Sequence, residues 1–141
     1  MTSTLKIVTS YVSPKTLEYF VGENYLPIFI LRHIINSEII GKYSRTAIHF
    51  PELSPSSLLF QHKRDGKITI DEFKADYLQE MAAVNLKDII HKLDLLTNFC
   101  NTDKVVLMGY GKDDIICHRS ALRDLLNNSG LLDFKIIEKE I

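Results

Sequence analysis

The chain has 141 residues, of which 45% are hydrophobic and 25% are charged, so its length and composition fit one globular domain with an apolar core. The formal net charge is −1 and no long basic run occurs, so charge gives no indication of nucleic-acid binding or of binding to a membrane surface. The longest apolar stretch, residues 26–35, contains Pro27, Arg32 and His33 and is too short to span a bilayer.

The first part of the chain predicts a strand, a helix and a second strand. Residues 5–9 are typical of a strand, and Ser13 with Pro14 then begins a helix that ends near Gly22. Residues 26–31 are continuously apolar, which predicts a strand buried on both faces. This order of elements implies a right-handed parallel β-α-β unit.

The middle of the chain is predicted to be helical. Ser54 and Pro55 repeat the serine–proline start and lead into a helix over residues 56–62. Residues 36–52 mix short helical patterns with loop residues, and no element is assigned to them. We expect that segment to lie close enough to a functional site to cover it.

Two further helices are predicted from their N-terminal caps. Thr69 and Glu72 have the spacing of a capping box, and Asn85 caps the following helix. The first helix places three side chains on one face: Phe73, Tyr77 and Met81. The second helix has its own apolar face: Ile89, Leu93 and Leu96.

The last part of the chain returns to strands. Residues 104–108 predict a third strand, residues 118–128 a helix that ends at Gly130, and residues 134–137 a fourth strand. This alternation favours one α/β domain over residues 1–141, with three layers, a mostly parallel sheet of about four or five strands and helices on both faces. Ligands bind such sheets beyond the carboxyl ends of the strands.

Three reactive side chains occupy consecutive positions at the predicted start of the last helix. They are the thiol of Cys117, the imidazole of His118 and the guanidinium of Arg119. The positive end of a helix dipole attracts anions and stabilises thiolates, which makes Cys117 a candidate nucleophile and His118 its candidate proton carrier. The alternative for Cys117 is a small residue packed beneath the helix start.

The two cationic neighbours of the thiol each have two interpretations. Arg119 is suited to binding a phosphate or carboxylate through its planar fork, and its alternative is a surface ion pair with Asp113, Asp114 or Asp124. His118 is suited to anion capture, and its alternative is a hydrogen bond to a backbone carbonyl.

Other candidates follow the second and third strands. Arg32 ends an apolar strand, and its charge requires a partner, which is a bound anion or a structural salt bridge. Tyr110 supplies a stacking ring and Lys112 a further positive charge after the third strand. Because carboxyl ends of parallel strands share one edge of the sheet, these residues are expected on the same side as Cys117.

A calcium site is predicted to be absent. Residues 65–73 resemble the second half of an EF-hand loop, but Gln61 and Lys63 occupy the first and third ligand positions. Four further histidines are scattered along the chain: His33, His49, His62 and His91. The sequence therefore predicts no metal site, and no cofactor motif is present.

The sequence supports three functional hypotheses. The first is a module that binds an anionic small molecule, a nucleotide or phosphate ester, through Arg32, Lys112 and Arg119 with Tyr110 stacking. The second is an enzyme in which Cys117 attacks an electrophilic carbon or phosphorus while His118 moves protons. The third is a protein-docking module. A homodimer is a further expectation, and the sequence does not test it.

The cellular location is predicted from the thiols and the N-terminus. Cys100 and Cys117 lie in different predicted elements, and no signal peptide is apparent. We therefore expect two reduced cysteines in a cytoplasmic protein.

Residues 107–112 and the Cys-His-Arg block at 117–119 together resemble the signature of the domain-of-unknown-function family 488, whose members typically have Leu-Leu-Cys-Tyr-Glu-Lys and then Cys-His-Arg at this spacing. Further matches lie upstream in the same order: Arg32, Leu53-Ser54-Pro55-Ser56, Phe73 and Tyr77. The resemblance covers residues 27–130. It implies a small α/β domain, mostly bacterial or phage-borne, and it implies no established reaction.

The chain departs from this family pattern at two positions. Gly109 replaces the usual cysteine, and Gly111 replaces the usual glutamate. If that glutamate is a general acid or base in the family, this chain lacks it. The departures favour a binding role or a divergent member of the family.

Overall fold

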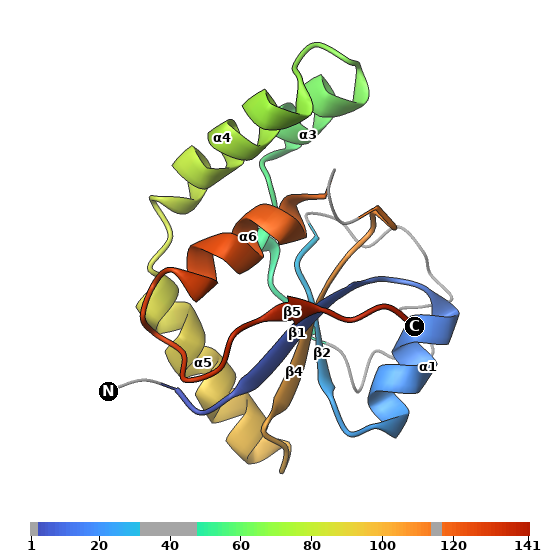
Figure 1. Ribbon diagram of the computed structural model, residues 1–141, viewed down its shortest axis with the longest axis vertical. Helices are drawn as coiled ribbons and strands as arrows, with labels where there is room; N and C mark the ends of the chain where they lie inside the picture. Colours follow the sequence, from blue (N-terminus) through green and yellow to red (C-terminus); the bar gives the residue numbers. More distant parts are fainter. Residues whose placement is uncertain (1–2, 32–47, 114–116) are drawn as a thin grey trace.

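The computed structural model describes residues 3–31, 48–113 and 117–141 (Figure 1). In this part of the chain five parallel strands form one sheet in the order β3-β2-β4-β1-β5. The strands are β1 (Lys6–Tyr11), β2 (Leu26–Phe29), β3 (Ile48–His49), β4 (Lys104–Gly109) and β5 (Ile137–Glu138). The helices are α1 (Pro14–Gly22), α3 (Ser57–Arg64), α4 (Ile70–Met81), α5 (Leu86–Phe99) and α6 (His118–Asn127), with a 3₁₀ turn, η1, at Pro51–Leu53.

Helices cover both faces of the sheet, as the sequence predicts. Side chains of the strands point alternately to the two faces, so Val106 packs on the α1 side and its neighbour Val105 on the other. Phe20 of α1 packs in the same apolar cluster as Val106. Leu93 of α5 and Leu122 of α6 pack in the cluster that contains Val105. Figure 1 shows α1 on one side of the strands and α5 and α6 on the other. The fold is therefore α/β with three layers.

The predicted helix caps are present. Ser13 and Thr16 form a capping box at α1, Thr69 and Glu72 form one at α4, and the Asn85 side chain accepts from the Asp88 N–H at α5. Each such cap stabilises a helix by about 1 kcal/mol, because it satisfies N–H groups that the first turn leaves unpaired.

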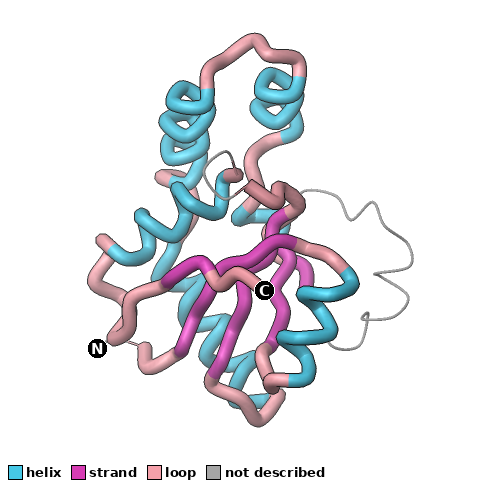
Figure 2. Tube along the Cα trace, turned by 45° about the vertical axis from the view of Figure 1, so that its right-hand side comes forward, coloured by secondary structure: helices cyan, strands magenta, loops and turns pink. Residues whose placement is uncertain are grey.

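The α3–α4 hairpin projects away from the sheet (Figures 1 and 2). Its turn includes Gly66, which has a φ of 72° that favours glycine. The predicted apolar face of α4 is confirmed, since Phe73, Tyr77 and Met81 are all buried. Helix α4 packs against α6, so the hairpin adjoins the helix whose N-cap is Cys117.

Two local predictions are wrong in detail, and one strand lies where none was assigned. The cap of α3 is Ser56 rather than Ser54, because Ser54 closes η1 with its own N–H bonded to the Pro51 carbonyl. The last strand is Ile137–Glu138 rather than 134–137, because Asn127 bonds both the N–H and the carbonyl of Ile136. The short strand β3 falls in the stretch to which the sequence assigned no element.

The strands β2 and β4 are adjacent and in register, with Phe29 opposite Met108. The Ile30 N–H then donates to the Met108 carbonyl at 3.0 Å. The strands β2 and β4 therefore end at the same edge of the sheet, as predicted for parallel strands. No helix in the described part of the chain has the length and apolar character needed to cross a membrane.

Candidate functional site

Cys117 is the N-cap residue of α6, with extended backbone angles of φ −94° and ψ 148°. Its side chain is buried, with 3% of the residue exposed. Two glycines border it, since a Cβ at Gly109 would lie 3.1 Å from Sγ and one at Gly111 would lie 3.3 Å from the cysteine Cβ. The strand end and the loop therefore approach the thiol closely because these two positions carry no side chain.

The imidazole of His118 lies beside this thiol. Its Nδ1 is 3.7 Å from the Cys117 Sγ, and its Nε2 is 2.7 Å from the Ile30 carbonyl oxygen. Because a carbonyl only accepts, Nε2 carries the proton, and in the neutral ring Nδ1 is left as an acceptor toward sulfur. The Tyr77 ring packs edge-on against the imidazole, with 5.3 Å between centroids. The ring is thus held in an orientation that suits proton transfer from the thiol.

The carbonyl hydrogen bond of His118 confirms the alternative that the sequence offered for this residue. That bond does not remove the histidine from the site, because it engages only Nε2. An imidazole oriented through one nitrogen and presented through the other is the usual arrangement of a histidine that activates a nucleophile.

The pKa of the Cys117 thiol is set by opposing effects. Burial raises it, whereas the hydrogen bond from His118, the charges of His118 and Arg119 and the backbone of Arg119 lower it, and together they bring the pKa to about 6. An ordinary thiol has a pKa near 8.5 and is only a few per cent ionised at pH 7. The thiol of Cys117 is mostly thiolate at that pH.

The guanidinium of Arg119 is directed inward. Its side chain is fully buried and its Nη2 lies 2.9 Å from Glu138 Oε2. Nε also donates to this carboxylate, while Nη1 donates to the Gly111 carbonyl and Nη2 to the Lys112 carbonyl. The alternative offered for Arg119, an ion pair at the surface, is wrong, because the side chain is fully buried and is directed toward Glu138 on β5.

Glu138 joins several elements. Besides the bonds from Arg119, it accepts a hydrogen bond of 2.7 Å from the Thr9 hydroxyl on β1 and lies 3.8 Å from Arg123 on α6. The Arg123 Nη1 in turn donates to Thr9 Oγ1 at 2.9 Å. The network ties the start of α6 and the loop after β4 to the strands β1 and β5.

The remaining predicted residues occupy different places. Tyr110 and Lys112 follow β4 and are exposed, and the Lys112 Nζ lies 6.0 Å from the centroid of the Tyr11 ring. They share the loop whose carbonyls bind Arg119. Arg32 lies outside the described residues.

Two residues of the site, Glu138 and Tyr77, were not predicted from the sequence as functional. Glu138 lies 19 positions from Arg119, and nothing local marks it as its partner. Tyr77 was predicted as part of an apolar face and as a match to the family pattern, without a role at the site, and its hydroxyl donates to the Leu53 carbonyl at 2.7 Å.

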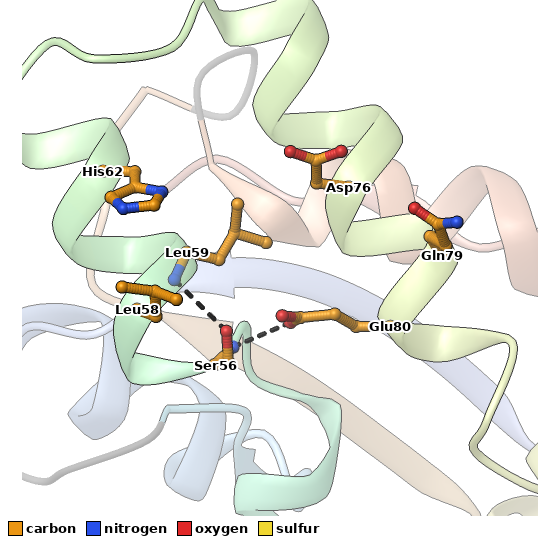
Figure 3. Close-up of a pocket in the computed structure, with 7 residues that line it drawn as sticks. All are labelled: Ser56, Leu58, Leu59, His62, Asp76, Gln79 and Glu80. Carbon is orange, nitrogen blue, oxygen red and sulfur yellow. Dashed lines mark hydrogen bonds between the residues drawn. The ribbon is translucent and has the colours of Figure 1, made fainter.

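A cavity of about 330 Å³ lies elsewhere, between α3 and α4 (Figure 3). Its lining residues are Ser56, Leu58, Leu59, His62, Asp76, Gln79 and Glu80. In it the Glu80 carboxylate accepts from the Ser56 N–H at 2.8 Å, a contact that fastens the two helices together. None of the predicted site residues lines this cavity, so it gives no support to the Cys117 site.

The described residues contain no group of three histidine, cysteine or acidic side chains that could hold a metal ion. The two cysteines are unpaired, with Cys100 exposed and Cys117 buried. The described side chains at the start of α6 supply a thiol, an imidazole and a guanidinium.

A scan against protein-family models matches residues 31–130 to DUF488-N3a, described as the active DUF488-N3 subclade. The chain belongs to the DUF488 family. The resemblance seen in the sequence is thereby confirmed. A search of curated proteins and a search of solved structures found no match. The matched DUF488 segment includes Cys117, His118 and Arg119 and ends before Glu138, so β5 contributes to the site from beyond it.

Proposed function

We propose that this DUF488 protein is an enzyme that uses the Cys117 thiolate as a nucleophile. The observation that carries the proposal is the placement of His118, whose Nδ1 faces the sulfur at 3.7 Å while Nε2 is held by the Ile30 carbonyl. A thiol buried merely for packing has a raised pKa, whereas the pKa of this one is lowered to about 6. The family description as an active subclade agrees with this proposal.

In the proposed reaction Cys117 reacts as a thiolate, and the proton that it has given up is held on His118 Nδ1. The thiolate attacks an electrophilic carbon or phosphorus, the new bond to sulfur forms, and the leaving group departs with its electron pair and takes the proton from the imidazolium. N–H groups at the start of α6 stabilise the negative charge that develops. Water then cleaves the covalent intermediate and regenerates the thiol.

Arg119 supports this reaction at longer range. Its N–H donors are directed at Glu138 and at two loop carbonyls, so it contributes charge near the thiolate and a fixed loop rather than direct contact with a substrate. This geometry is the reason that catalysis is preferred here over the binding hypothesis, which gave Arg119 the role of anion ligand.

The experiment follows the covalent intermediate. The Cys100→Ser protein is mixed with p-nitrophenyl acetate and, separately, with p-nitrophenyl phosphate, and the p-nitrophenolate released and the intact mass are recorded. We expect one of the two esters to leave an acyl or phosphoryl group on the protein, and expect Cys117→Ala in the same background to abolish the adduct and turnover. Equal release with both proteins, or no adduct with either ester, contradicts the proposal.

Binding of an anionic small molecule is the second candidate. It is favoured by Tyr110 and Lys112, which lie exposed on the loop that adjoins Cys117. Binding without catalysis survives Cys117→Ser, since a hydroxyl replaces the thiol at nearly the same volume. Thermal shifts with nucleotides and phosphate esters that persist in Cys117→Ser and vanish in Lys112→Gln would support it over the enzyme.

A further inference from the structure

The cavity between α3 and α4 has an apolar part and a polar part. Figure 3 shows residues of α3 on one side of it and residues of α4 on the other. Leu58 and Leu59 of α3 form the apolar part, and Leu58 is 63% exposed whereas Leu59 is buried. The volume of about 330 Å³ lies in the range of cavities that hold small organic molecules. A ligand that enters from solvent therefore meets apolar surface here.

Two carboxylates line the α4 side of the cavity. Asp76 and Glu80 are four residues apart, which places them on the same helix face one turn from each other. Glu80 accepts a hydrogen bond from the Ser56 N–H at 2.8 Å. Asp76 forms no hydrogen bond or ion pair with the described residues. Because like charges at this spacing destabilise a helix, a cation between the two carboxylates would be favourable.

The described chain supplies no such cation. No lysine or arginine of the described residues lines the cavity. At the end of α3, the Lys63 Nζ lies 4.5 Å from the centroid of the Phe73 ring, and the Arg64 Nε lies 3.8 Å from Asp65 Oδ1. The positive charge that suits this cavity would therefore come from a ligand.

Two neutral polar groups add to the rim. His62 of α3 and Gln79 of α4 line the same cavity, and neither side chain forms a hydrogen bond with the described residues. An imidazole nitrogen and an amide oxygen can each accept a hydrogen bond. A guanidinium or ammonium head carries several N–H donors, so it can use these acceptors together with the carboxylates.

We propose that this cavity binds a small organic cation, in which an alkyl chain ends in a guanidinium or ammonium group. The charged head lies between Asp76 and Glu80, and the chain packs along Leu58 and Leu59. Alkyl stems of cationic side chains pack on apolar surface in this way while their heads stay near water. An anion would be repelled by the two carboxylates, and a neutral apolar molecule would cover them without a counter-charge.

The test uses butylguanidinium as the probe and two matched molecules that each lack one feature. Methylguanidinium has the charged head without the chain, and butanol has the chain without the charge. Each is titrated at low salt into the full-length protein labelled with ¹⁵N, and the backbone amide signals are followed. We expect butylguanidinium to shift the signals of Ser56, Leu59 and Gln79 in a saturable way, with an affinity at least about threefold higher than that of either matched molecule.

Variants on α4 test the role of the carboxylates. Asp76→Asn is expected to weaken butylguanidinium binding by about threefold or more, because one of the two negative charges is lost. Glu80→Gln keeps an acceptor for the Ser56 N–H and is expected to weaken binding in the same direction. Asp71→Asn removes the same charge from an exposed position in the first turn of α4, outside the cavity, and is expected to leave the affinity unchanged.

Three results would overturn the proposal. They are equal affinities in Asp76→Asn and Asp71→Asn, binding of butanol as tight as that of butylguanidinium, and signal shifts that do not saturate. Urea unfolding of each variant verifies that a weaker affinity comes from a folded protein. These measurements do not depend on the reactivity of Cys117, so they test the cavity whether or not the chain is an enzyme.

The same titration distinguishes two sources of the cation. The peptide acetyl-Ala-Arg-Ala-amide presents the same head and a similar chain as part of a polypeptide. Tighter binding of the peptide than of butylguanidinium supports the site and assigns it to an arginine of a partner protein. Tighter binding of butylguanidinium supports the site and assigns it to a free small molecule.

Discussion

The guanidinium of Arg119 and the carboxylate of Glu138 form an ion pair inside the protein, with 2.9 Å between Nη2 and Oε2. The arginine side chain is 0% exposed and the glutamate side chain 14%. Arg119 also binds the carbonyls of Gly111 and Lys112, so one side chain links α6, the loop after β4 and β5. The pair fixes the surroundings of the nucleophile.

Removing the glutamate tests how much the fold depends on this pair. Glu138→Ala is expected to lower the free energy of unfolding by about 3–5 kcal/mol, because it removes the carboxylate that pairs with a buried arginine. Urea denaturation measures the change. Lys92→Ala breaks the exposed pair with Asp88, 3.3 Å long, and serves as the control with an expected cost within about 0.5 kcal/mol. Similar losses in the two variants would refute the structural role of Glu138.

Replacement of His118 tests the origin of the low thiol pKa. In His118→Ala, burial still raises the pKa of Cys117, but the hydrogen bond and the charge of His118, which lower that pKa, are gone. The alkylation midpoint is therefore expected to move upward from about 6. His62→Ala, a change on α3 at the hairpin cavity, is the control and is expected to leave the midpoint in place. A midpoint unchanged in His118→Ala contradicts the account.

Stability is expected to depend on pH through the same thiol. The pKa of Cys117 is lowered to about 6 in the folded protein. In the unfolded chain the pKa of a cysteine thiol is about 8.5. A lowered pKa means that the fold favours the thiolate, so this stabilisation is complete above pH 8.5 and is lost as the pH falls through 6. Its size at high pH is about 3 kcal/mol.

The comparison that isolates this contribution is between the parent protein and Cys117→Ser, which has no titratable group at the position. The difference between their free energies of unfolding is expected to grow from pH 5.5 to pH 9. A difference that stays constant or shrinks over that interval shows that the thiol pKa is not lowered by folding.

Two variants of Tyr77 distinguish the packing of its ring against His118 from the hydrogen bond of its hydroxyl group. Tyr77→Phe keeps the ring against His118 and removes the hydroxyl that donates to the Leu53 carbonyl at 2.7 Å. The expected cost in the free energy of unfolding is about 1–3 kcal/mol, because a buried carbonyl loses its donor, and the alkylation rate of Cys117 should not change. Tyr77→Leu also removes the ring and should alter that rate. Equal rates in both variants would mean that the ring does not position the imidazole.

Local patterns explain how much of the fold was predictable. The caps at Ser13, Thr69 and Asn85 and the burial of the strand after residue 104 depend on residues a few positions apart, and the structure confirms them. The strand order was not predictable, since β4 inserts between β1 and β2 through pairing over long sequence distances. The last strand was misplaced because Asn127, distant from it, bonds the backbone of Ile136.

The site was partly predictable for the same reason. Cys117 and His118 are neighbours in sequence, and the strand–loop–helix pattern placed them together at a helix start. The partner of the imidazole, the Ile30 carbonyl, is 88 residues away, and the Tyr77 ring that packs against it comes from α4. Tertiary contacts of this kind leave no periodic trace in the sequence.

The central claim is that Cys117 is a thiolate nucleophile near neutral pH. Its most direct test is the rate of reaction of the Cys100→Ser protein with iodoacetamide between pH 4 and pH 10, with the modified residue identified by mass spectrometry. The account predicts a rate that rises with a midpoint near pH 6 and is level above it. A midpoint at about 8.5 or higher, or a thiol that does not react at any pH, would contradict it.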